Sequence, residues 1–221
     1  MRNRFFCIIA ILLLLQAATA VEFTFIVSRL PNSSGYNLVS FPVLPANDSI
    51  ANVIGTQLPV GTSVLWFNNA IGAFQLTSRY TTGWRWSNGF RLSRGKGYYI
   101  VLRWDSPLTS YQVTVEGDTV TATSWDMGTI GVGYNMVGSV WYSPNPIANS
   151  NVMESGLRGG YFAGMSDKIT TVDISKFLVV WLNSQNQWVT SDFTNFEPGK
   201  GYYIIRRAGR TPPTFQWQNT R

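Results

Sequence analysis

Hydrophobic and polar positions alternate along this chain in short runs rather than in long helical stretches. Residues 23–28, 111–115 and 120–123 are rich in β-branched and aromatic side chains and are bounded by glycine, proline, asparagine or serine, which is typical of β-strands. Residues 50–57 and 149–157 each predict a helical turn or two. The pattern therefore predicts an all-β fold.

Turn residues between these runs predict two hairpins. Gly117-Asp118 separates the runs 111–115 and 120–123, and glycine accepts the positive φ that a two-residue hairpin turn requires. The segment 177–182, the polar turn 183–186 and the segment 187–190 indicate a second strand, turn and strand.

Two motifs occur twice and in the same order. Gly-Tyr-Asn-Leu-Val at 35–39 returns as Gly-Tyr-Asn-Met-Val at 133–137, and Gly-Lys-Gly-Tyr-Tyr-Ile at 95–100 is repeated unchanged at 199–204. Between them, Val-Leu-Trp-Phe-Asn beginning at Val64 is similar to the segment 179–183 and precedes a second aromatic residue, as that segment does. Repeats of this kind indicate duplicated units. We expect two tandem, related β-sandwich-like or small barrel-like modules, residues 21–118 and 119–221.

The repeated hexamer has the pattern of a structural strand. Tyr98 and Ile100 lie on one face of such a strand and Tyr99 on the other, because side chains alternate, and one face is core. Gly95 and Gly97 suit a bulge or a close approach of backbone. The predicted structural signature is Gly35, Asn37, Gly95, Gly97 and Tyr98, with Gly133, Asn135, Gly199, Gly201 and Tyr202 in the second copy.

The first twenty residues predict a cleaved signal peptide. Arg2 and Arg4 precede an apolar run over 5–15, and Ala18-Thr19-Ala20 is typical of a cleavage site. The run is shorter than the about 20 residues that a membrane-spanning helix needs. We expect cleavage before Val21, a secreted, extracellular or cell-surface location with the periplasm as the alternative, and no stable membrane insertion afterwards.

The order of the motifs carries a family resemblance. Gly-Tyr-Asn-Leu-Val-Ser-Phe-Pro, beginning at Gly35, is followed by a tryptophan-containing hairpin and by Gly-Lys-Gly-Tyr-Tyr-Ile. This resembles the tandem "GWN-L-I-x-x-P … W … GkGYwi" repeats of secreted and cell-surface proteins of bacteria and archaea, as in modules of sorted surface proteins of Bacteroidetes. The resemblance implies an all-β extracellular module without catalytic residues. Tyr36 and Tyr134 replace the usual tryptophan, and Val140-Trp141 stands in the second copy where the first has Pro42.

Charge and the missing residue types narrow the chemistry. The formal charge of +6 becomes +4 without Arg2 and Arg4, and the densest basic group, Arg206-Arg207-Arg210, is interpreted as solvated strand-end charges, so no nucleic-acid partner is expected. The chain has no histidine, and its single cysteine, Cys7, lies in the signal segment. Ser-His-Asp and Cys-His sites and most zinc or copper centres are thereby excluded. We expect no enzymatic activity, no cofactor and no metal.

Carboxylates leave two remote alternatives. A glycoside hydrolase needs two positioned carboxylates, and those near predicted turns are Asp105, Glu116, Asp118, Asp167 and Asp192. Solvated turn residues are the simpler interpretation. Asp167 with Asp173 leaves a calcium site open.

Aromatic residues are the compositional excess. Trp84-Arg85-Trp86 places two indoles on one strand face. An exposed face would stack on sugar rings, with Arg85 or Tyr80 for polar contacts; a buried face would belong to the core or to a module or subunit interface. Asn32-Ser33-Ser34 and Asn47-Asp48-Ser49 are N-glycosylation sequons whose use depends on the host.

Two functions from different classes remain, with a glycoside hydrolase as a remote third. The first is a non-enzymatic exported structural or assembly component of the cell envelope or extracellular matrix. Its partners would be other envelope or extracellular proteins, or copies of itself joined through the strand 21–28 and a neighbour's sheet edge. The second is a carbohydrate-binding or adhesive module with a polysaccharide partner.

Overall fold

The computed structural model describes residues 20–86, 90–173, 176–189 and 192–221. It confirms the all-β prediction, because antiparallel sheets dominate this part of the chain and the helical segments are single turns. No helix among these residues is long and apolar enough to cross a membrane.

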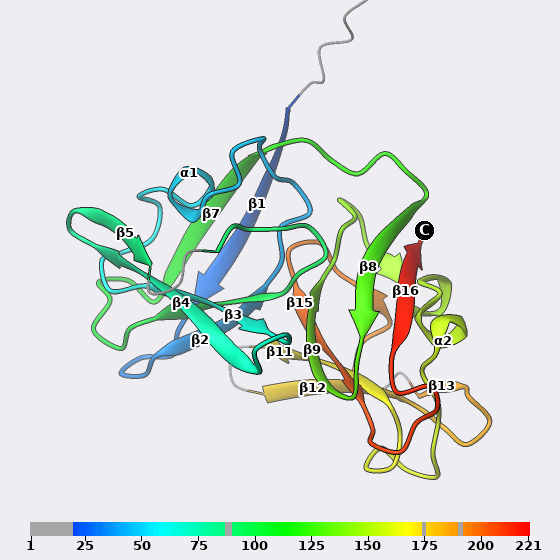
Figure 1. The fold of residues 1–221 in the computed structure, drawn as a ribbon. Coiled ribbons are helices and arrows are strands. Elements are labelled where there is room, and N and C mark those ends of the chain that lie inside the picture. The colour runs from blue at the N-terminus through cyan, green and yellow to red at the C-terminus, as the bar shows by residue number, and fades with distance from the viewer. Residues whose placement is uncertain (1–19, 87–89, 174–175, 190–191) are drawn as a thin grey trace, which may run out of the picture.

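The first half of the chain forms a sandwich-like pair of sheets (Figure 1). β1 (Val21–Ser28) pairs with β7 (Ser110–Gly117) over all eight residues. The second sheet has the order β2-β6-β3-β4-β5. Its strands, and the helical turn α1 beside them, are β2 (Gly35–Val39), α1 (Ile50–Val53), β3 (Ser63–Asn68), β4 (Ala73–Tyr80), β5 (Gly83–Trp86) and β6 (Tyr98–Leu102).

The second half repeats this topology strand for strand. β8 (Ser124–Ile130) pairs with β16 (Phe215–Thr220), and the five-stranded sheet has the order β9-β15-β11-β12-β13. Its strands are β9 (Gly133–Gly138), β11 (Lys168–Asp173), β12 (Lys176–Leu182), β13 (Trp188–Val189) and β15 (Gly201–Arg206). Small additional elements are β10 (Asn145–Pro146), η1 (Ile147–Asn149), α2 (Val152–Ser155) and β14 (Asn195–Phe196).

Each half has its own apolar core between its two sheets. In the first, Val27 of β1 and Val113 of β7 pack with Tyr98 and Ile100 of β6. In the second, Ile130, Trp217, Tyr202 and Ile204 occupy the corresponding strands, together with further buried residues of the same half. The first tyrosine of each repeated hexamer therefore belongs to the core face, as alternation in the hexamer allows.

Two local predictions are wrong. Residues 120–123 form no strand, and Asp118 makes an isolated bridge with Leu44, so Gly117-Asp118 is not a hairpin turn. β7 pairs instead with β1, some ninety residues earlier in the chain.

The two similar tryptophan segments lie on different strands. The segment from Val64 lies on β3, which pairs with β6. The segment 179–183 begins on β12, which does not pair with β15, the counterpart of β6. The two similar tryptophan segments thus occupy non-equivalent strands.

The asparagine of the Gly-Tyr-Asn motif has a structural role in both halves. The Asn37 side chain accepts from the Ser28 backbone N–H at 2.7 Å and donates to the Ser28 carbonyl at 2.9 Å and the Ile100 carbonyl at 3.2 Å. Asn135 makes the same three contacts, at 3.0, 2.8 and 3.1 Å, with Gly131 and Ile204. An amide carries the same donor and acceptor as a peptide group, so it satisfies backbone where the chain leaves β1 or β8.

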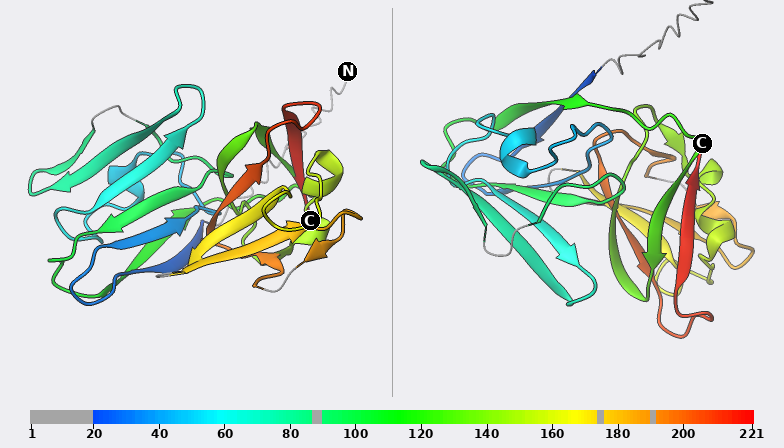
Figure 2. Two further views of the ribbon diagram at one scale, coloured as in Figure 1. Left: turned by 90° about the horizontal axis from the view of Figure 1, so that it is seen from below. Right: turned by 45° about the horizontal axis from the view of Figure 1, so that its top comes forward.

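The Gly-Lys-Gly motif joins the two halves to each other. Ser40 N–H donates to the Gly199 carbonyl, and Gly138 N–H donates to the Gly95 carbonyl, both at 2.9 Å. The two bonds are equivalent and reciprocal, as in a contact with twofold symmetry. Figure 2 shows the two five-stranded sheets side by side at this junction. β2 is the edge strand of the first five-stranded sheet, and the second half covers it. β9 is the edge strand of the second five-stranded sheet, and the first half covers it in the same way.

Candidate functional site

Four repeat tyrosines form a row across the junction. Tyr36 packs edge-on against Tyr99 with ring centroids 6.1 Å apart, and Tyr134 packs in the same way against Tyr203 at 5.7 Å. Tyr99 and Tyr203, the second tyrosines of the two hexamers, lie 6.2 Å apart. Equivalent residues of the two halves thus meet on the face of the sheets that points away from the cores.

A cleft of about 490 Å³ opens along this row, within the range of small-molecule sites. β3, β4, β6, β9, β11, β12 and β15 contribute its lining, which is mainly aromatic and aliphatic: Phe67, Phe74, Tyr99, Tyr134, Lys168, Thr170, Phe177, Val179, Tyr203 and Ile205. Tyr134 is 62% exposed, and Phe74 and Phe177 are exposed as well. Aromatic ring surface is therefore available to a ligand.

A single charged side chain lies among the residues that line the cleft. Burial lowers the pKa of Lys168, and the neighbouring Arg207 lowers it further. Burial, together with the Tyr99 hydroxyl, raises the pKa of Tyr203 well above its usual range. Like any tyrosine, Tyr203 is a neutral phenol at physiological pH and is able to donate or accept a hydrogen bond. The cleft suits a neutral or anionic ligand that packs against rings.

The cleft continues toward the tip of the β3–β4 hairpin. A hollow of about 530 Å³ shares Phe67 and Tyr134 with it and is also lined by Asn69 and by the other residues of 131–135. Asn69 donates to the Asn135 side chain at 3.2 Å across the junction. The two hollows together form a groove longer than one pocket.

The predicted Trp84 platform is divided between two faces of β5. Trp84 is half-buried, packs against the first core and donates its indole N–H to the Gly55 carbonyl at 2.8 Å. Arg85 lies on the opposite face, with its guanidinium carbon 5.5 Å from the centroid of the exposed Tyr80 ring. Strand alternation separates them, so Trp84 is not part of a platform with Arg85 and Tyr80. The side chain of Trp86 lies outside the described residues.

Trp84 has a counterpart in the second half, Trp188. In β4–β5, Arg79 faces Trp84, and in β12–β13, Leu182 faces Trp188. Trp84 and Trp188 therefore occupy corresponding strands, and each packs against the core of its own half.

The carboxylates singled out in the sequence are dispersed. Asp105 pairs with Arg103 at 2.7 Å, and Asp192 accepts from the Val179 backbone N–H at 2.7 Å. Asp167 is fully buried, whereas Asp173 is exposed at the far end of β11, about 20 Å away along an extended strand. Within the described ranges no three His, Cys, Asp or Glu side chains gather as a metal site would need.

The interpretation of Arg206-Arg207-Arg210 as solvated charges is wrong. Arg206 is 1% exposed, and its guanidinium carbon lies 4.8 Å from the Phe215 ring centroid. Burial lowers its pKa. Arg210 forms an ion pair with buried Asp167 at 3.3 Å. These arginines hold the second half together rather than extending freely into solvent.

Both sequon asparagines lie on exposed loops of the first half. Asn32 has a left-handed backbone with φ of 57°, and the Asn47 side chain accepts from Ser49 N–H at 3.3 Å. Their glycosylation stays a prediction.

The tyrosine row was not among the predicted site residues. The available signal was the second face of the hexamer, where Tyr99 and Tyr203 recur without being needed for a core. Comparison of the chain with protein-family models, with curated proteins and with solved structures found no match.

Proposed function

We propose that the protein is a non-catalytic, exported component of the cell envelope or extracellular matrix and that it holds a carbohydrate chain in the cleft between its two halves. The observation that carries this proposal is the convergence of Tyr99, Tyr134 and Tyr203 on one cleft. The signal-like segment and the resemblance to repeats of exported surface proteins support the location.

The chemistry of the cleft suits sugars. The C–H face of a pyranose packs against aromatic rings, and a tyrosine adds a hydroxyl at the edge of its ring. Tyr99, Tyr134 and Tyr203 supply such hydroxyls, and Lys168 and Thr170 supply further polar groups beside the apolar wall. The continuation of the cleft past Asn69 favours a chain of several sugars over a single one.

The test compares Tyr134→Ala with Tyr80→Ala. Tyr80 is 51% exposed, similar to Tyr134, and does not line the cleft. Calorimetric titration with soluble glucan, mannan, chitin-derived and peptidoglycan-derived oligosaccharides should find a binder for the unaltered protein. Loss of one aromatic contact should then weaken binding about 3- to 10-fold in Tyr134→Ala only. Absence of binding to every oligosaccharide, or equal binding by both variants, would refute the proposal.

A second candidate function, assembly, is favoured by the two-stranded sheet β1–β7. β1 pairs with β7 along one edge, and among the described strands no ladder pairs with its other edge, next to which Ile26 is exposed. β1 is thus already paired with β7 inside the first half, so self-association would add a strand beside its second edge instead of donating β1. On that edge Asn37 and Tyr142 already bond the backbone of Ser28 and Glu22, at the two ends of the strand. Light scattering of residues 21–221 at several concentrations tests this, and a monomer at all of them would exclude it.

A further inference from the structure

A loop between α2 and β11 presents three large apolar side chains to solvent. Tyr161 is 84% exposed, and Phe162 and Met165 are each more than half exposed. They lie within five residues of each other on one tight loop, in which the Phe162 carbonyl accepts from Met165 N–H and from the Ser166 hydroxyl, both at 2.9 Å. Apolar groups gathered on an exposed loop of this kind mark an interaction surface.

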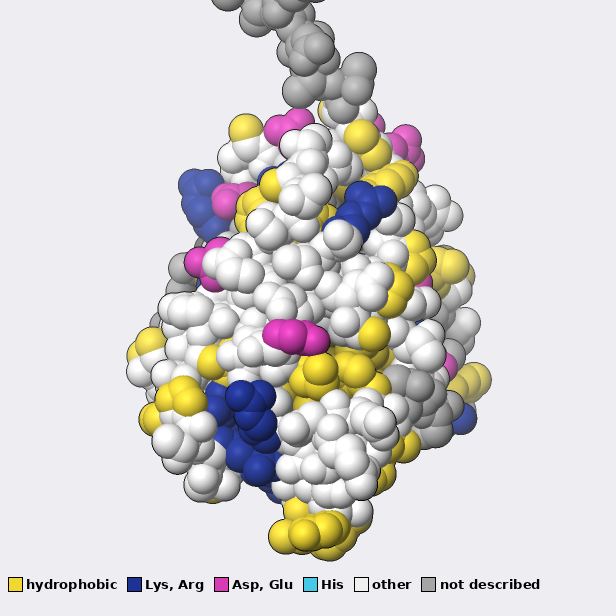
Figure 3. All heavy atoms as spheres, turned by 90° about the vertical axis from the view of Figure 1, so that its right-hand side faces the viewer, with side chains coloured by type: hydrophobic (Ala, Val, Ile, Leu, Met, Phe, Trp, Pro, Cys, Tyr) yellow, Lys and Arg dark blue, Asp and Glu magenta, His cyan; other side chains and the backbone are white. Residues whose placement is uncertain are grey.

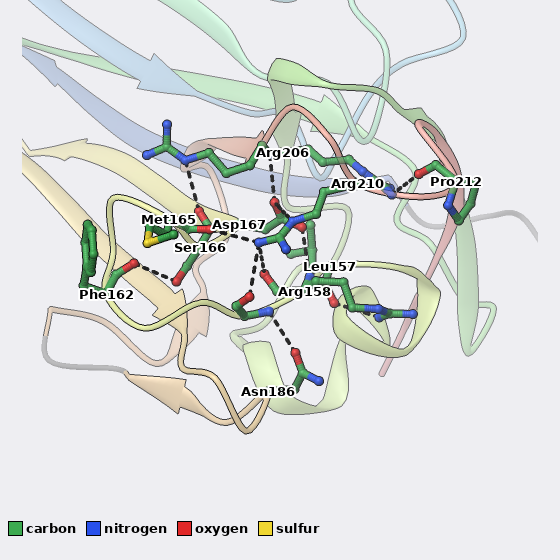
Figure 4. Close-up of polar contacts among 12 residues, drawn as sticks. Leu157, Arg158, Phe162, Met165, Ser166, Asp167, Asn186, Arg206, Arg210 and Pro212 are labelled. Atoms are coloured by element: carbon green, nitrogen blue, oxygen red, sulfur yellow. Dashed lines mark hydrogen bonds and ion pairs between the residues drawn. The ribbon is translucent and has the colours of Figure 1, made fainter.

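The base of the loop is fixed by a buried carboxylate. Asp167 accepts from the backbone N–H groups of Arg158 at 2.9 Å and Arg207 at 2.8 Å, and from the Arg210 side chain at 3.3 Å. Arg210 also donates to the carbonyls of Arg158, Gly159 and Met165 at 3.0–3.2 Å. Figure 4 shows these contacts converging beneath the loop. The loop is therefore held in one shape from below.

The space under the loop is filled by backbone, which keeps the apolar side chains outside. A Cβ atom on Gly159 would lie 1.6 Å from the Asn183 carbonyl oxygen, and one on Gly160 would lie 2.8 Å from the Met165 backbone. Gly159 N–H also donates to the Asn186 side chain at 2.8 Å. The inward side of the loop at Gly159 and Gly160 is thus made of packed and hydrogen-bonded main chain, and the Tyr161 and Phe162 rings lie on the exposed side.

Two arginines that form no ion pair within the described part of the chain lie at the base of this loop. The charge of Arg210 is matched by buried Asp167, whereas no ion pair holds Arg158 or Arg207 among the described residues. Arg158 is exposed, and its guanidinium donates to the carbonyls of Leu157 at 2.8 Å and Met153 at 3.3 Å. Figure 3 shows the side of the molecule that lies at the right in Figure 1, with a group of hydrophobic side chains at its lower end and a strip of Lys and Arg above and to the left of that group.

We propose that this loop, with Tyr161, Phe162 and Met165 at its tip, inserts into the interfacial region of a bilayer that contains anionic lipids. Aromatic rings favour the interface, where their apolar body and polar edge are both accommodated. Basic residues next to an apolar tip add attraction to anionic headgroups. A convex tip fits a fluid bilayer without a complementary groove. The contact is peripheral and needs no membrane-spanning segment.

The experiment measures co-sedimentation of residues 21–221 with vesicles. Vesicles of phosphatidylcholine mixed with phosphatidylglycerol should bind the protein, and vesicles of phosphatidylcholine alone should bind it at least several-fold less. The double substitution Tyr161→Ser and Phe162→Ser should lower the partition coefficient at least tenfold, while Tyr80→Ser leaves it unchanged. Arg158→Gln should lower it several-fold and weaken its dependence on salt.

Other outcomes would overturn the inference. If mixed vesicles do not bind the protein, or bind the Tyr161/Phe162 variant as well as the unaltered chain, the loop has no membrane role. If vesicles do not bind the protein, and a co-purifying protein is lost on substitution of Tyr161, the surface binds a protein partner instead. The Tyr161/Phe162 variant should retain its melting temperature and its oligosaccharide affinity, so failure here is distinguishable from failure of the carbohydrate proposal.

Discussion

Replacement of Gly97 and Gly201 by alanine should test the junction between the two halves directly. A Cβ atom on Gly97 would lie 2.7 Å from the Val137 carbonyl oxygen, and one on Gly201 would lie 2.8 Å from the Val39 carbonyl oxygen. Ordinary contact begins near 3.4 Å, so each junction contact must open by about 0.6–0.7 Å, and the obstacle is backbone rather than a flexible side chain. Neither glycine has a positive φ, so the cost arises from space and not from conformation.

The expected loss follows from what such an opening disturbs. Overpacking of a well-packed contact costs about 1–3 kcal/mol, and for a protein of this size each kcal/mol lowers the melting temperature by about 2–4 °C. The double variant should lose less than the sum of the single losses, because both substitutions open the same contact.

Gly131→Ala is the matched control for this experiment. It also lacks a positive φ, and its Cβ would meet its nearest atom only at 3.9 Å. Urea denaturation and thermal melts of the four variants, followed by circular dichroism, give the comparison. If Gly97→Ala and Gly201→Ala are as stable as Gly131→Ala, the reciprocal contact does not stabilise the protein and our explanation of the repeated hexamer is wrong.

Three further changes follow from the cores. Burial raises the pKa of Tyr98 and Tyr202 above the unfolded value of about 10, so the stability they contribute is complete below about pH 10 and is lost as the pH rises toward the folded pKa. The free energy of unfolding from urea curves should fall above pH 10 by up to about 1.4 kcal/mol per pH unit for each tyrosine, and less steeply in Tyr98→Phe; an unchanged slope in that variant would contradict the assignment. Trp84→Ala should lower the free energy of unfolding by about 2–4 kcal/mol in the same assay, through lost packing and one lost hydrogen bond. An unchanged free energy of unfolding would contradict the packing of Trp84 against the core. Asn135→Ala should cost about 2–4 kcal/mol, because it leaves buried backbone groups without partners, and Asn69→Ala should cost less than about 1 kcal/mol; equal losses would contradict the structural role of Asn135.

The alternation of hydrophobic and polar residues predicted the features that depend on neighbouring residues in the chain. It placed Tyr98 and Tyr99 on opposite faces of one strand, and the polar turn at 183–186 separated β12 from β13 correctly. It failed where partners are distant: the residues after Gly117-Asp118 have strand-like side chains, yet β7 pairs with β1 near the other end of the first half. Strand propensity in the four residues 120–123 does not outweigh the eight-residue ladder between β1 and β7.

The site was less predictable than the fold for the same reason. Trp84 and Trp86 are neighbours in sequence and therefore suggest a platform, whereas Tyr99 and Tyr203 are a hundred residues apart and meet only after the halves dock. The similarity of the segments from Val64 and Val179 was also misleading, because a tryptophan suits either strand of a hairpin. Sequence identifies aromatic residues, and tertiary docking decides which of them share a surface.

The reciprocal glycine contact has a consequence for the free energy of assembling the cleft. Each half presents both a Gly-Lys-Gly loop and the strand end that receives one, which is the self-complementary surface of a symmetric dimer. Here a peptide linkage joins the two copies, so their encounter is intramolecular, with an effective concentration on the order of millimolar. A weak contact is then sufficient to keep the tyrosine row assembled. The cleft is complete in every single chain at any dilution.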